Sequence, residues 1–413
     1  MMIFIAKLVA NDADRIKARH SSSRNFLTML AVLVAKYTIS VLSIEPKLPQ
    51  GRKGFCTFAK SFFMSTFYKL HINDVRRETP HAISVAFNIP DGLRDFYKFT
   101  AGQYVTLKLT LDGEEIRRAY SICSSPESGE LRIAIKSVPV GAFSNFANKN
   151  LRVGDIVEVG LPEGKFTFEP DASRNRNYIG FAAGSGITPV MAIMQSVLES
   201  EPNSTFVLVY GNKSADETIF YSQIHELQSR HTGRLFVYYV FSREKADGQL
   251  FGRIDKSVVN FVLNNKHKEL DFDKYYLCGP EEMINTVSQI LKERNVREKD
   301  IRFELFFAAP TGNEVTKNIE GHTKITVIVD DEETTFEMSA KQTLLEAALK
   351  QGLDAPYSCQ GGICSSCIAR VKNGTAEMRK NSILTDGEIA EGLILTCQAH
   401  PTSGEITVDY DDV

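Results

Sequence analysis

At 413 residues the chain is too long for one ordinary domain, and its length predicts about two to four domains. Hydrophobic residues make up 43%, charged residues 24%, and the net charge is -3, which describes a soluble globular protein without the basic excess of a nucleic-acid binder. DNA and RNA are therefore excluded as partners. Three of the seven cysteines lie between Cys359 and Cys367, a spacing that favours metal ligation under reducing conditions over a disulfide framework.

The first 63 residues differ from the rest of the chain. Lys36 interrupts two short apolar runs, at 26–35 and 37–44, which makes a membrane span marginal. No convincing small-residue cleavage site follows them, so secretion is not indicated and a cytoplasmic location is expected. Basic residues between Arg15 and Arg24 leave two interpretations open, a helix on the membrane surface or a poorly ordered leader, of which we favour the leader.

From Phe67 onward, apolar and polar residues alternate in short runs that Pro, Gly and Asp separate. A period of two with frequent turns predicts antiparallel strands, arranged as a small β-barrel. The predicted strands lie at 68–72, 83–87 and 104–109.

After Asn177 the pattern changes to a strand at 178–183, a glycine loop at 184–186 and a helix from Thr188. This order is typical of a parallel α/β unit. Further strands are expected at 206–210, 235–241 and 275–277, with enough residues between them for crossover helices. A linker with Pro and Gly follows at 308–322, and the rest of the chain predicts an α+β domain with a strand at 324–329 and a helix at 344–351.

Four cysteines of the last domain have the spacing of a plant-type [2Fe-2S] cluster, with four residues, two residues and then 29 residues between successive ligands. These ligands are Cys359, Cys364, Cys367 and Cys397. Gly361 and Gly362 would let backbone amides approach the cluster sulfides. The alternative is a four-cysteine zinc site, which usually pairs its ligands in two close knuckles, whereas Cys397 stands alone.

Four shorter motifs precede the cysteine loop. They are Arg118-Ala119-Tyr120-Ser121, Gly141-Ala142-Phe143-Ser144, Gly184-Ser185-Gly186-Ile187-Thr188-Pro189 and Cys278-Gly279-Pro280. With the cysteine spacing, residues 66–410 resemble the ferredoxin-NADP reductase superfamily with a C-terminal plant-type ferredoxin. The resemblance implies a multidomain fold: an antiparallel β-barrel FAD domain at 64–172, an α/β parallel-sheet NAD(P) domain at 173–307, the linker at 308–322 and an α+β β-grasp ferredoxin domain at 323–413.

The resemblance assigns the first motif to the flavin. Arg118 would hold flavin phosphate, Tyr120 would pack on the isoalloxazine, and Ser121 would reach N5, where hydride arrives. A fixed cation, a flat apolar ring and a hydroxyl suit these tasks. Taken alone, these residues would also suit an ordinary strand.

The second motif, with Gly141, Phe143 and Ser144, precedes a predicted helix and would carry the FAD pyrophosphate at the helix N-terminus, which favours FAD over FMN. The segment at 161–166 resembles the P-x-G-x-F turn that closes the flavin domain of the family. By itself it would be a plain turn.

The third motif would bind the nicotinamide nucleotide, because glycines admit phosphate and the following helix contributes its positive dipole. The residues implied are Gly184, Gly186, Thr188 and Pro189.

The fourth motif would face the nicotinamide, with Cys278, Gly279 and Pro280 beside the ring; a purely structural cysteine is the alternative for Cys278. Glu304 lies where the family often has an acidic residue near the flavin, although it would also suit a charged strand end. The residues expected at the reacting atoms are thus Ser121, Tyr120, Cys278 and Glu304.

We predict NADPH as the preferred nucleotide, with NADH as the alternative. Ser242, Arg243 and Arg253 resemble the residues with which plant-type reductases grip the 2'-phosphate. Two other interpretations remain open: Arg243 pairs with Glu244 on a solvated loop, or Glu244 binds the ribose of NADH.

Together the motifs imply that hydride passes from NADPH to FAD near Ser121 and that single electrons then leave through the cluster. No protein acid, base or nucleophile is required. The stretches 102–104, 112–123, 210–213 and 252–255 resemble the reductase subunits of bacterial phenylacetyl-CoA epoxidases, which implies a di-iron oxygenase partner and a role in phenylacetate catabolism. Alternatives are another oxygenase, a desaturase or the hybrid-cluster protein as acceptor, or a non-catalytic ferredoxin-like carrier or sensor.

Overall fold

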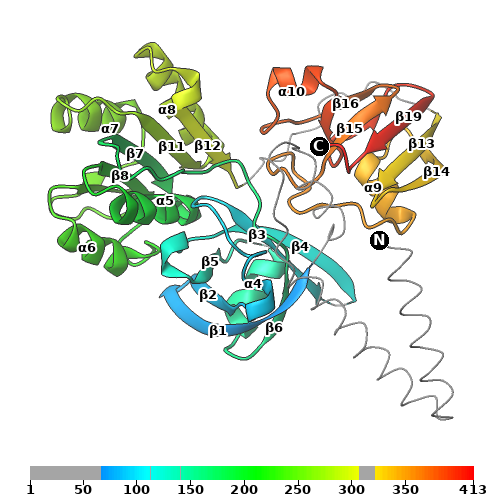
Figure 1. Cartoon of the computed structure of the whole chain (residues 1–413). Helices are drawn as coiled ribbons and strands as arrows, with labels where there is room; N and C mark the ends of the chain where they lie inside the picture. Colours follow the sequence, from blue (N-terminus) through cyan, green and yellow to red (C-terminus); the bar gives the residue numbers. More distant parts are fainter. Residues whose placement is uncertain (1–66, 112, 140, 307–320) are drawn as a thin grey trace, which may run out of the picture. The chain divides into compact units, whose positions relative to one another are not determined.

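The computed structural model describes residues 67–111, 113–139, 141–306 and 321–413, all within the unit Phe63–Val413 (Figure 1). The expectations for the leader and for most of the linker lie outside these residues. In the described part of the chain, no helix is both long enough and apolar enough to cross a membrane.

The first sheet is antiparallel, with its six strands in the order β4-β3-β6-β1-β2-β5. Its strands are β1 (Tyr68–Thr79), β2 (Ala82–Asn88), β3 (Tyr104–Leu111), β4 (Glu114–Ser121), β5 (Leu131–Lys136) and β6 (Ile156–Val159), with short 3-10 helices η1 (Asp91–Leu93) and η2 (Pro126–Ser128) between them. Alternate apolar residues such as Val105 and Leu107 fill the interior. A bridge between Ile122 and Ile133 joins the chain after β4 to β5, which closes the sheet as the predicted barrel.

The helix α4 (Ala142–Asn150) packs Phe143 and Ala147 into the core of this barrel. Gly141 is its N-cap, so the second motif forms the cap and the first turn of the helix. The sequence pattern places the motif before the helix, and the difference is small because helix ends are poorly marked by local pattern.

The second sheet is parallel, in the order β10-β9-β8-β7-β11-β12. Its strands are β7 (Asn177–Ala183), β8 (Thr205–Asn212), β9 (Leu235–Phe241), β10 (Leu250–Phe251), β11 (Lys274–Gly279) and β12 (Ile301–Leu305). Helices cover both faces, which explains why the central strands are apolar at nearly every position (Figure 1). In β7, Tyr178 and Ala182 face one core while Ile179 and Phe181 face the other.

The helices α5 (Ile187–Ser200) and α6 (Tyr221–Arg230) pack on the first of these faces. The helix α7 (Lys256–Asn260), the π-helix η4 (Phe261–Lys266) and α8 (Glu281–Glu293) pack on the second, and η5 (Glu298–Asp300) leads into β12. The strand, glycine loop and helix predicted from residue 178 onward are confirmed.

The C-terminal domain has a mixed sheet in the order β14-β13-β19-β15-β17, in which β13 runs parallel to β19. Its elements are β13 (His322–Val329), β14 (Glu332–Ser339), α9 (Leu344–Lys350), β15 (Ile368–Asn373), β16 (Ala376–Met378), α10 (Asp386–Ala390), β17 (Leu393–Leu395), β18 (Ala399–Pro401) and β19 (Glu405–Asp409). A capping box between Thr343 and Glu346 begins α9, whose Leu344 and Ala348 pack into the core beside this sheet. The α+β expectation is confirmed, and β13 starts at His322, inside the expected linker.

A close approach between two strand ends shapes the nucleotide domain. β7 leads through the 3-10 helix η3 (Gly184–Gly186) into α5. Gly186 has an ordinary φ of -61°, yet a Cβ atom at this position would lie 2.1 Å from the carbonyl oxygen of Cys278. A missing side chain at Gly186 therefore lets α5 begin directly against the end of β11.

The substitution Gly186→Ala is expected to lower the free energy of unfolding by about 1–3 kcal/mol, because the added methyl group forces backbone apart in a packed site. Urea unfolding would measure the change. Gly92→Ala is the matched control, since a Cβ atom at Gly92 meets nothing within 4 Å. Equal unfolding midpoints for the two variants would contradict this account.

Candidate functional site

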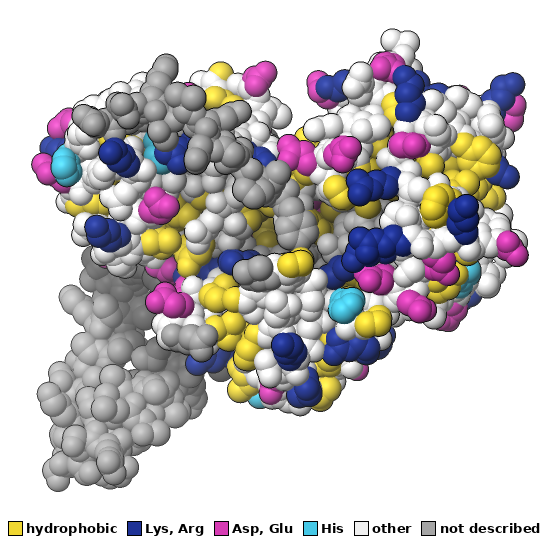
Figure 2. Space-filling model, turned by 180° about the vertical axis from the view of Figure 1, so that it is seen from behind, with side chains coloured by type: hydrophobic (Ala, Val, Ile, Leu, Met, Phe, Trp, Pro, Cys, Tyr) yellow, Lys and Arg dark blue, Asp and Glu magenta, His cyan; other side chains and the backbone are white. Residues whose placement is uncertain are grey.

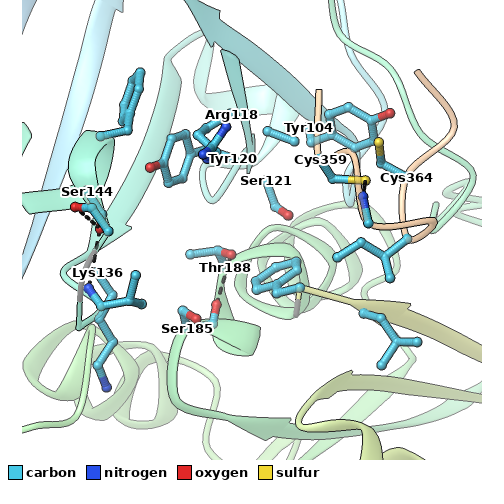
Figure 3. Close-up of a pocket in the computed structure, with 18 of the residues that line it drawn as sticks. Tyr104, Arg118, Tyr120, Ser121, Lys136, Ser144, Ser185, Thr188, Cys359 and Cys364 are labelled. Carbon is cyan, nitrogen blue, oxygen red and sulfur yellow. Dashed lines mark hydrogen bonds between the residues drawn. The ribbon is translucent and has the colours of Figure 1, made fainter. Parts of the chain in front are cut away.

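A cavity of about 470 Å³ brings the first two motifs together with Glu304 and the cysteine loop (Figure 3). Its wall contains Arg118, Tyr120 and Ser121 from the end of β4, then Gly141, Phe143 and Ser144 from the start of α4. Ser185 and Thr188 come from the glycine loop, Glu304 from β12, and Cys359 and Cys364 from the cysteine loop. Residues separated by more than 200 positions in the chain thus line one space.

The strand period explains why Arg118 and Tyr120 act together. Side chains two residues apart point to the same face of a strand, while Arg117, just before Arg118, is buried on the other face. The Tyr120 ring lies 5.6 Å from the ring of Phe143, centroid to centroid, and the Arg118 guanidinium donates to the Arg117 carbonyl at 2.7 Å. Figure 3 shows the Arg118 and Tyr120 side chains next to each other at the cavity wall.

The start of α4 provides the second part of this wall. The Ser144 hydroxyl accepts a hydrogen bond from the Val138 amide at 3.3 Å, which ties the helix start to the preceding loop. A Cβ atom at Gly141 would lie 2.5 Å from the Ser144 oxygen, so a larger residue would disturb the turn. Phe143 is buried, and its ring packs against the ring of Tyr120. Phe143 therefore contributes to the cavity wall by packing.

A half-buried glutamate, Glu304, belongs to the wall of the cavity. Ser121 donates a hydrogen bond to Glu304 at 3.1 Å, and Cys278 lies opposite Glu304 in the register of β11 and β12. Burial raises the pKa of Glu304 to about 8, and the hydrogen bond from Ser121 offsets only part of this rise. Burial also raises the pKa of the Cys278 thiol, and the nearby Glu304 carboxylate raises it further when charged. Cys278 is therefore a neutral thiol.

The four predicted cluster ligands come together, and none of them forms a disulfide. Cys359 interacts through its sulfur with Cys364 and Cys397, and Cys367 interacts with Cys397. The Gly361 amide donates to the Cys359 sulfur at 3.3 Å. The hydrogen bonds with Cys364 and Cys397, together with that from the Gly361 amide, lower the pKa of Cys359. Among the described residues, no three His, Cys, Asp or Glu side chains are arranged as ligands of a single metal ion. A [2Fe-2S] cluster needs only two cysteines on each of its two irons.

A second cavity, of about 570 Å³, lies along the carboxyl ends of the parallel strands, where α/β sheets usually bind nucleotides. Gly184, Ser242, Arg253 and Pro280 line it, together with Lys213. Gly186, Pro189, Arg243, Cys278 and Gly279 are not among its lining residues. Gly186 and Cys278 instead form the close contact beneath the glycine loop.

The loop after β9 differs from the sequence expectation in one respect. The Arg243 side chain is exposed and its amide donates to the Lys213 carbonyl at 2.9 Å, whereas Glu244 accepts from the Ala215 amide at 2.8 Å. The Glu244 carboxylate is therefore tied to the neighbouring loop. Of the two predicted arginines, Arg243 and Arg253, only Arg253 lines the second cavity. Its guanidinium also lies 3.9 Å from the Glu282 carboxylate.

Sequence reasoning missed two residues of the first cavity. Lys136, at the end of β5, lines both cavities, and Tyr104, at the start of β3, lines the first. A basic residue just ahead of the second motif was a usable signal for Lys136. Tyr104 belongs to the stretch 102–104 that resembles the reductase subunits, but a tyrosine at a strand start is common, so this residue was given no role in the site.

The residues around the first cavity fit FAD, and the cysteine loop fits a [2Fe-2S] cluster. A cation and a helix start suit phosphate groups, a tyrosine face suits a flat ring, and four thiols with a nearby amide donor suit iron. When bound, FAD accepts hydride and releases electrons one at a time to the cluster. Arg118 would then neutralise phosphate, while Ser121, held by Glu304, would orient toward the ring.

Three family models match the chain in this same order. They are an oxidoreductase FAD-binding domain at residues 71–168, an oxidoreductase NAD-binding domain at 181–289 and a 2Fe-2S iron-sulfur cluster binding domain at 327–402.

Two relatives match almost over their whole length. One subunit of the 1,2-phenylacetyl-CoA epoxidase of Escherichia coli K12 is 37% identical over 359 residues, which cover 84% of this chain and 99% of that protein. The ferredoxin reductase component of 3-ketosteroid-9-alpha-monooxygenase from Rhodococcus rhodochrous is 30% identical over 351 residues, covering 83% and 96%.

Two solved structures share the fold. Phthalate dioxygenase reductase superposes with a TM-score of 0.54 at 23% identity, covering 83% of this chain and 98% of that chain. A type IV self-sufficient cytochrome P450 monooxygenase superposes with a TM-score of 0.61 at 20% identity, covering 90% of this chain, which spans 44% of the monooxygenase.

The fold and the two cavities, together with the cysteine loop, define a flavin- and iron-sulfur-dependent oxidoreductase that uses a nicotinamide nucleotide. The chain belongs to the ferredoxin-NADP reductase superfamily, in the branch that carries a C-terminal plant-type [2Fe-2S] domain.

The raised pKa of Glu304 predicts how stability depends on pH. An unfolded Glu304 releases its proton near pH 4.5, while the folded carboxyl keeps it up to about pH 8, so the folded state binds more protons in this window. Stability should therefore fall as pH rises from 4.5 to 8. Between pH 4.5 and 8, the free energy of unfolding of the unmutated protein should fall by at least about 1.4 kcal/mol more than that of Glu304→Gln, whose side chain stays neutral. This is the energy equivalent of one pKa unit.

Unfolding by urea at several pH values, on protein without added nucleotide, would test this dependence. Glu169→Gln, at an exposed position, is the control and should leave the pH dependence unchanged. Parallel pH profiles for the unmutated protein and Glu304→Gln would contradict the assignment.

Proposed function

We propose that this chain takes hydride from NADPH onto FAD and passes single electrons through its [2Fe-2S] cluster to a separate oxygenase. The shared cavity wall supports this proposal best. Ser121, where hydride would arrive, and Cys359 and Cys364, which would hold iron, line the same space. Electrons would then have a short path from the flavin to the cluster without leaving the chain.

For the acceptor we propose the di-iron oxygenase of a phenylacetyl-CoA epoxidase. The chain aligns at 37% identity with nearly the whole of one component of such an enzyme. The competing acceptor is the oxygenase of another system, which the 30% identity to a ketosteroid monooxygenase reductase component supports. Phenylacetyl-CoA-dependent NADPH oxidation upon mixing with the oxygenase subunits would distinguish the two.

A non-catalytic carrier or sensor is the alternative of a different class. The two cavities argue against it, because a carrier needs no nucleotide cavity beside its flavin. Rapid bleaching of the flavin and cluster absorbance by NADPH would exclude it.

We propose the domain limits 64–172 for FAD, 173–307 for the nucleotide, 308–322 for the linker and 323–413 for the cluster, with residues 1–63 as a dispensable leader. A cytoplasmic location is part of the proposal, since the reductant NADPH is found inside cells and unpaired cysteines persist in a reducing compartment.

Loss of the cluster should separate the two halves of the reaction. Cys367→Ser is expected to abolish electron transfer to the oxygenase and to leave NADPH-dependent ferricyanide reduction largely intact. Cys367 is the better choice than Cys364 because Cys364 also lines the flavin cavity. Loss of FAD from Cys367→Ser, seen in its visible spectrum, would refute this separation.

Nucleotide preference should depend on Arg253 more than on Arg243, because Arg253 lines the second cavity. Arg253→Ala is expected to raise the KM for NADPH, by the equivalent of about 1–3 kcal/mol for a lost charge-assisted hydrogen bond, and to change the KM for NADH much less. Steady-state kinetics with both nucleotides would measure this, with Arg243→Ala alongside. Equal efficiency with NADPH and NADH in the unmutated protein would contradict the NADPH preference.

A further inference from the structure

The ferredoxin domain contacts the flavin domain through the loop that carries its cysteines. The Tyr104 hydroxyl lies 3.0 Å from the Ser365 oxygen and 3.1 Å from the Ser366 oxygen, and both serines fall between Cys364 and Cys367. Tyr104 is only 4% exposed. This contact therefore joins a buried residue of the flavin cavity to the segment between two cluster ligands.

Neighbouring residues of the flavin domain hold the Tyr104 side chain in this place. Glu163 pairs with Tyr104 through both backbone amides at 2.8 Å, and its carboxylate accepts hydrogen bonds from Tyr104 at 3.3 Å and from Ser366 at 3.1 Å. A Cβ atom at Gly164 would lie 3.1 Å from the Tyr104 ring, so the glycine lets the turn pack flat against it. The segment at 161–166, predicted as a plain closing turn, thus supports an interdomain contact.

A second anchor lies on the neighbouring strand. Arg117, which β4 directs away from the flavin cavity, donates to Asp354 of the ferredoxin domain at 3.0 Å and has its guanidinium 4.5 Å from the centre of the Tyr357 ring. Arg117 is buried, so this pair is shielded from solvent on one side. Adjacent arginines therefore have different tasks, with Arg118 at the cavity and Arg117 at the domain contact.

The cysteine loop also packs against the nucleotide domain. Ile363 joins the apolar core that contains Met283 and Leu305, and Lys380 lies 3.5 Å from Glu281. The loop is thus held from two directions, by the hydroxyl contact of Tyr104 and by the packing of Ile363, and both of these residues line the flavin cavity.

We propose that Tyr104 is a positioning residue that seats the Ser365-Ser366 segment of the cluster loop against the flavin cavity, with Arg117 as a second anchor. Each transfer across this contact moves one electron, which the flavin loses and one ferric ion of the cluster gains to become ferrous. The rate of electron transfer falls steeply as the distance between flavin and cluster grows. A loosened cluster loop therefore slows this step and leaves hydride transfer unchanged.

The test uses the full chain loaded with FAD and cluster, in the variants Tyr104→Phe and Ser365→Ala/Ser366→Ala. After anaerobic mixing with NADPH, the serine variant, whose substituted residues do not line the flavin cavity, should keep its rate of flavin reduction, while reduction of the cluster should slow about tenfold in both variants, as expected when a partly buried hydrogen bond between the domains is lost. Hydrogen exchange of residues 359–367 should become faster, which provides a readout independent of turnover. Arg117→Gln should show the same pattern.

Tyr97→Phe is the matched control. Tyr97 is equally buried, at 4% exposed, and its hydroxyl donates to the Val159 carbonyl inside the flavin domain at 2.6 Å. This variant should leave the cluster step and the loop exchange unchanged. The proposal is overturned if Tyr104→Phe reduces its cluster at the unmutated rate, if its flavin reduction slows to the same extent, or if Tyr97→Phe gives the same defect.

Discussion

The structure depends on one constraint, that electrons leave a nicotinamide in pairs and enter an iron-sulfur cluster singly. A flavin can bridge this mismatch, because it takes up a hydride and releases electrons one at a time. Ser121, Glu304, Cys359 and Cys364 all line the first cavity, whose residues fit FAD. Barrel, parallel sheet and β-grasp domain each contribute residues to that wall, so the three domains line one space. Figure 2, which views the molecule from behind, shows Lys and Arg side chains mixed with Asp and Glu over the face in view, as expected for a net charge of only -3.

The parallel sheet contributes to the cavity because the backbone at the start of α5 lies very close to the end of β11. With no side chain at Gly186, the start of α5 meets the end of β11, and Cys278 then lies beside Glu304 on the adjacent strand. The pKa of the Glu304 carboxyl is raised to about 8 by burial. In its neutral form this carboxyl would still accept the Ser121 hydrogen bond and would place no full negative charge in the cavity.

Alternation along strands separates functions that are adjacent in sequence. Arg117 and Arg118 point to opposite faces of β4, so one reaches the ferredoxin domain and the other the flavin cavity. Tyr104 and Ser121 lie opposite each other in β3 and β4, which places the proposed domain contact next to the position where hydride would arrive. Relatives that belong to oxygenase systems align with this chain over nearly their whole length.

The sequence by itself determined what depends on neighbouring residues. Apolar alternation predicted three of the six strands of the barrel, β1, β2 and β3. The glycine loop predicted the turn into α5, and the cysteine spacing predicted a set of ligands that the structure brings together. Only the tertiary structure decided which motifs share a cavity, that Arg253 and not Arg243 lines the second cavity, and that the Tyr104 hydroxyl meets Ser365. Those contacts join residues far apart in the chain, and they follow from strand register and domain packing, which no local pattern of residue types records.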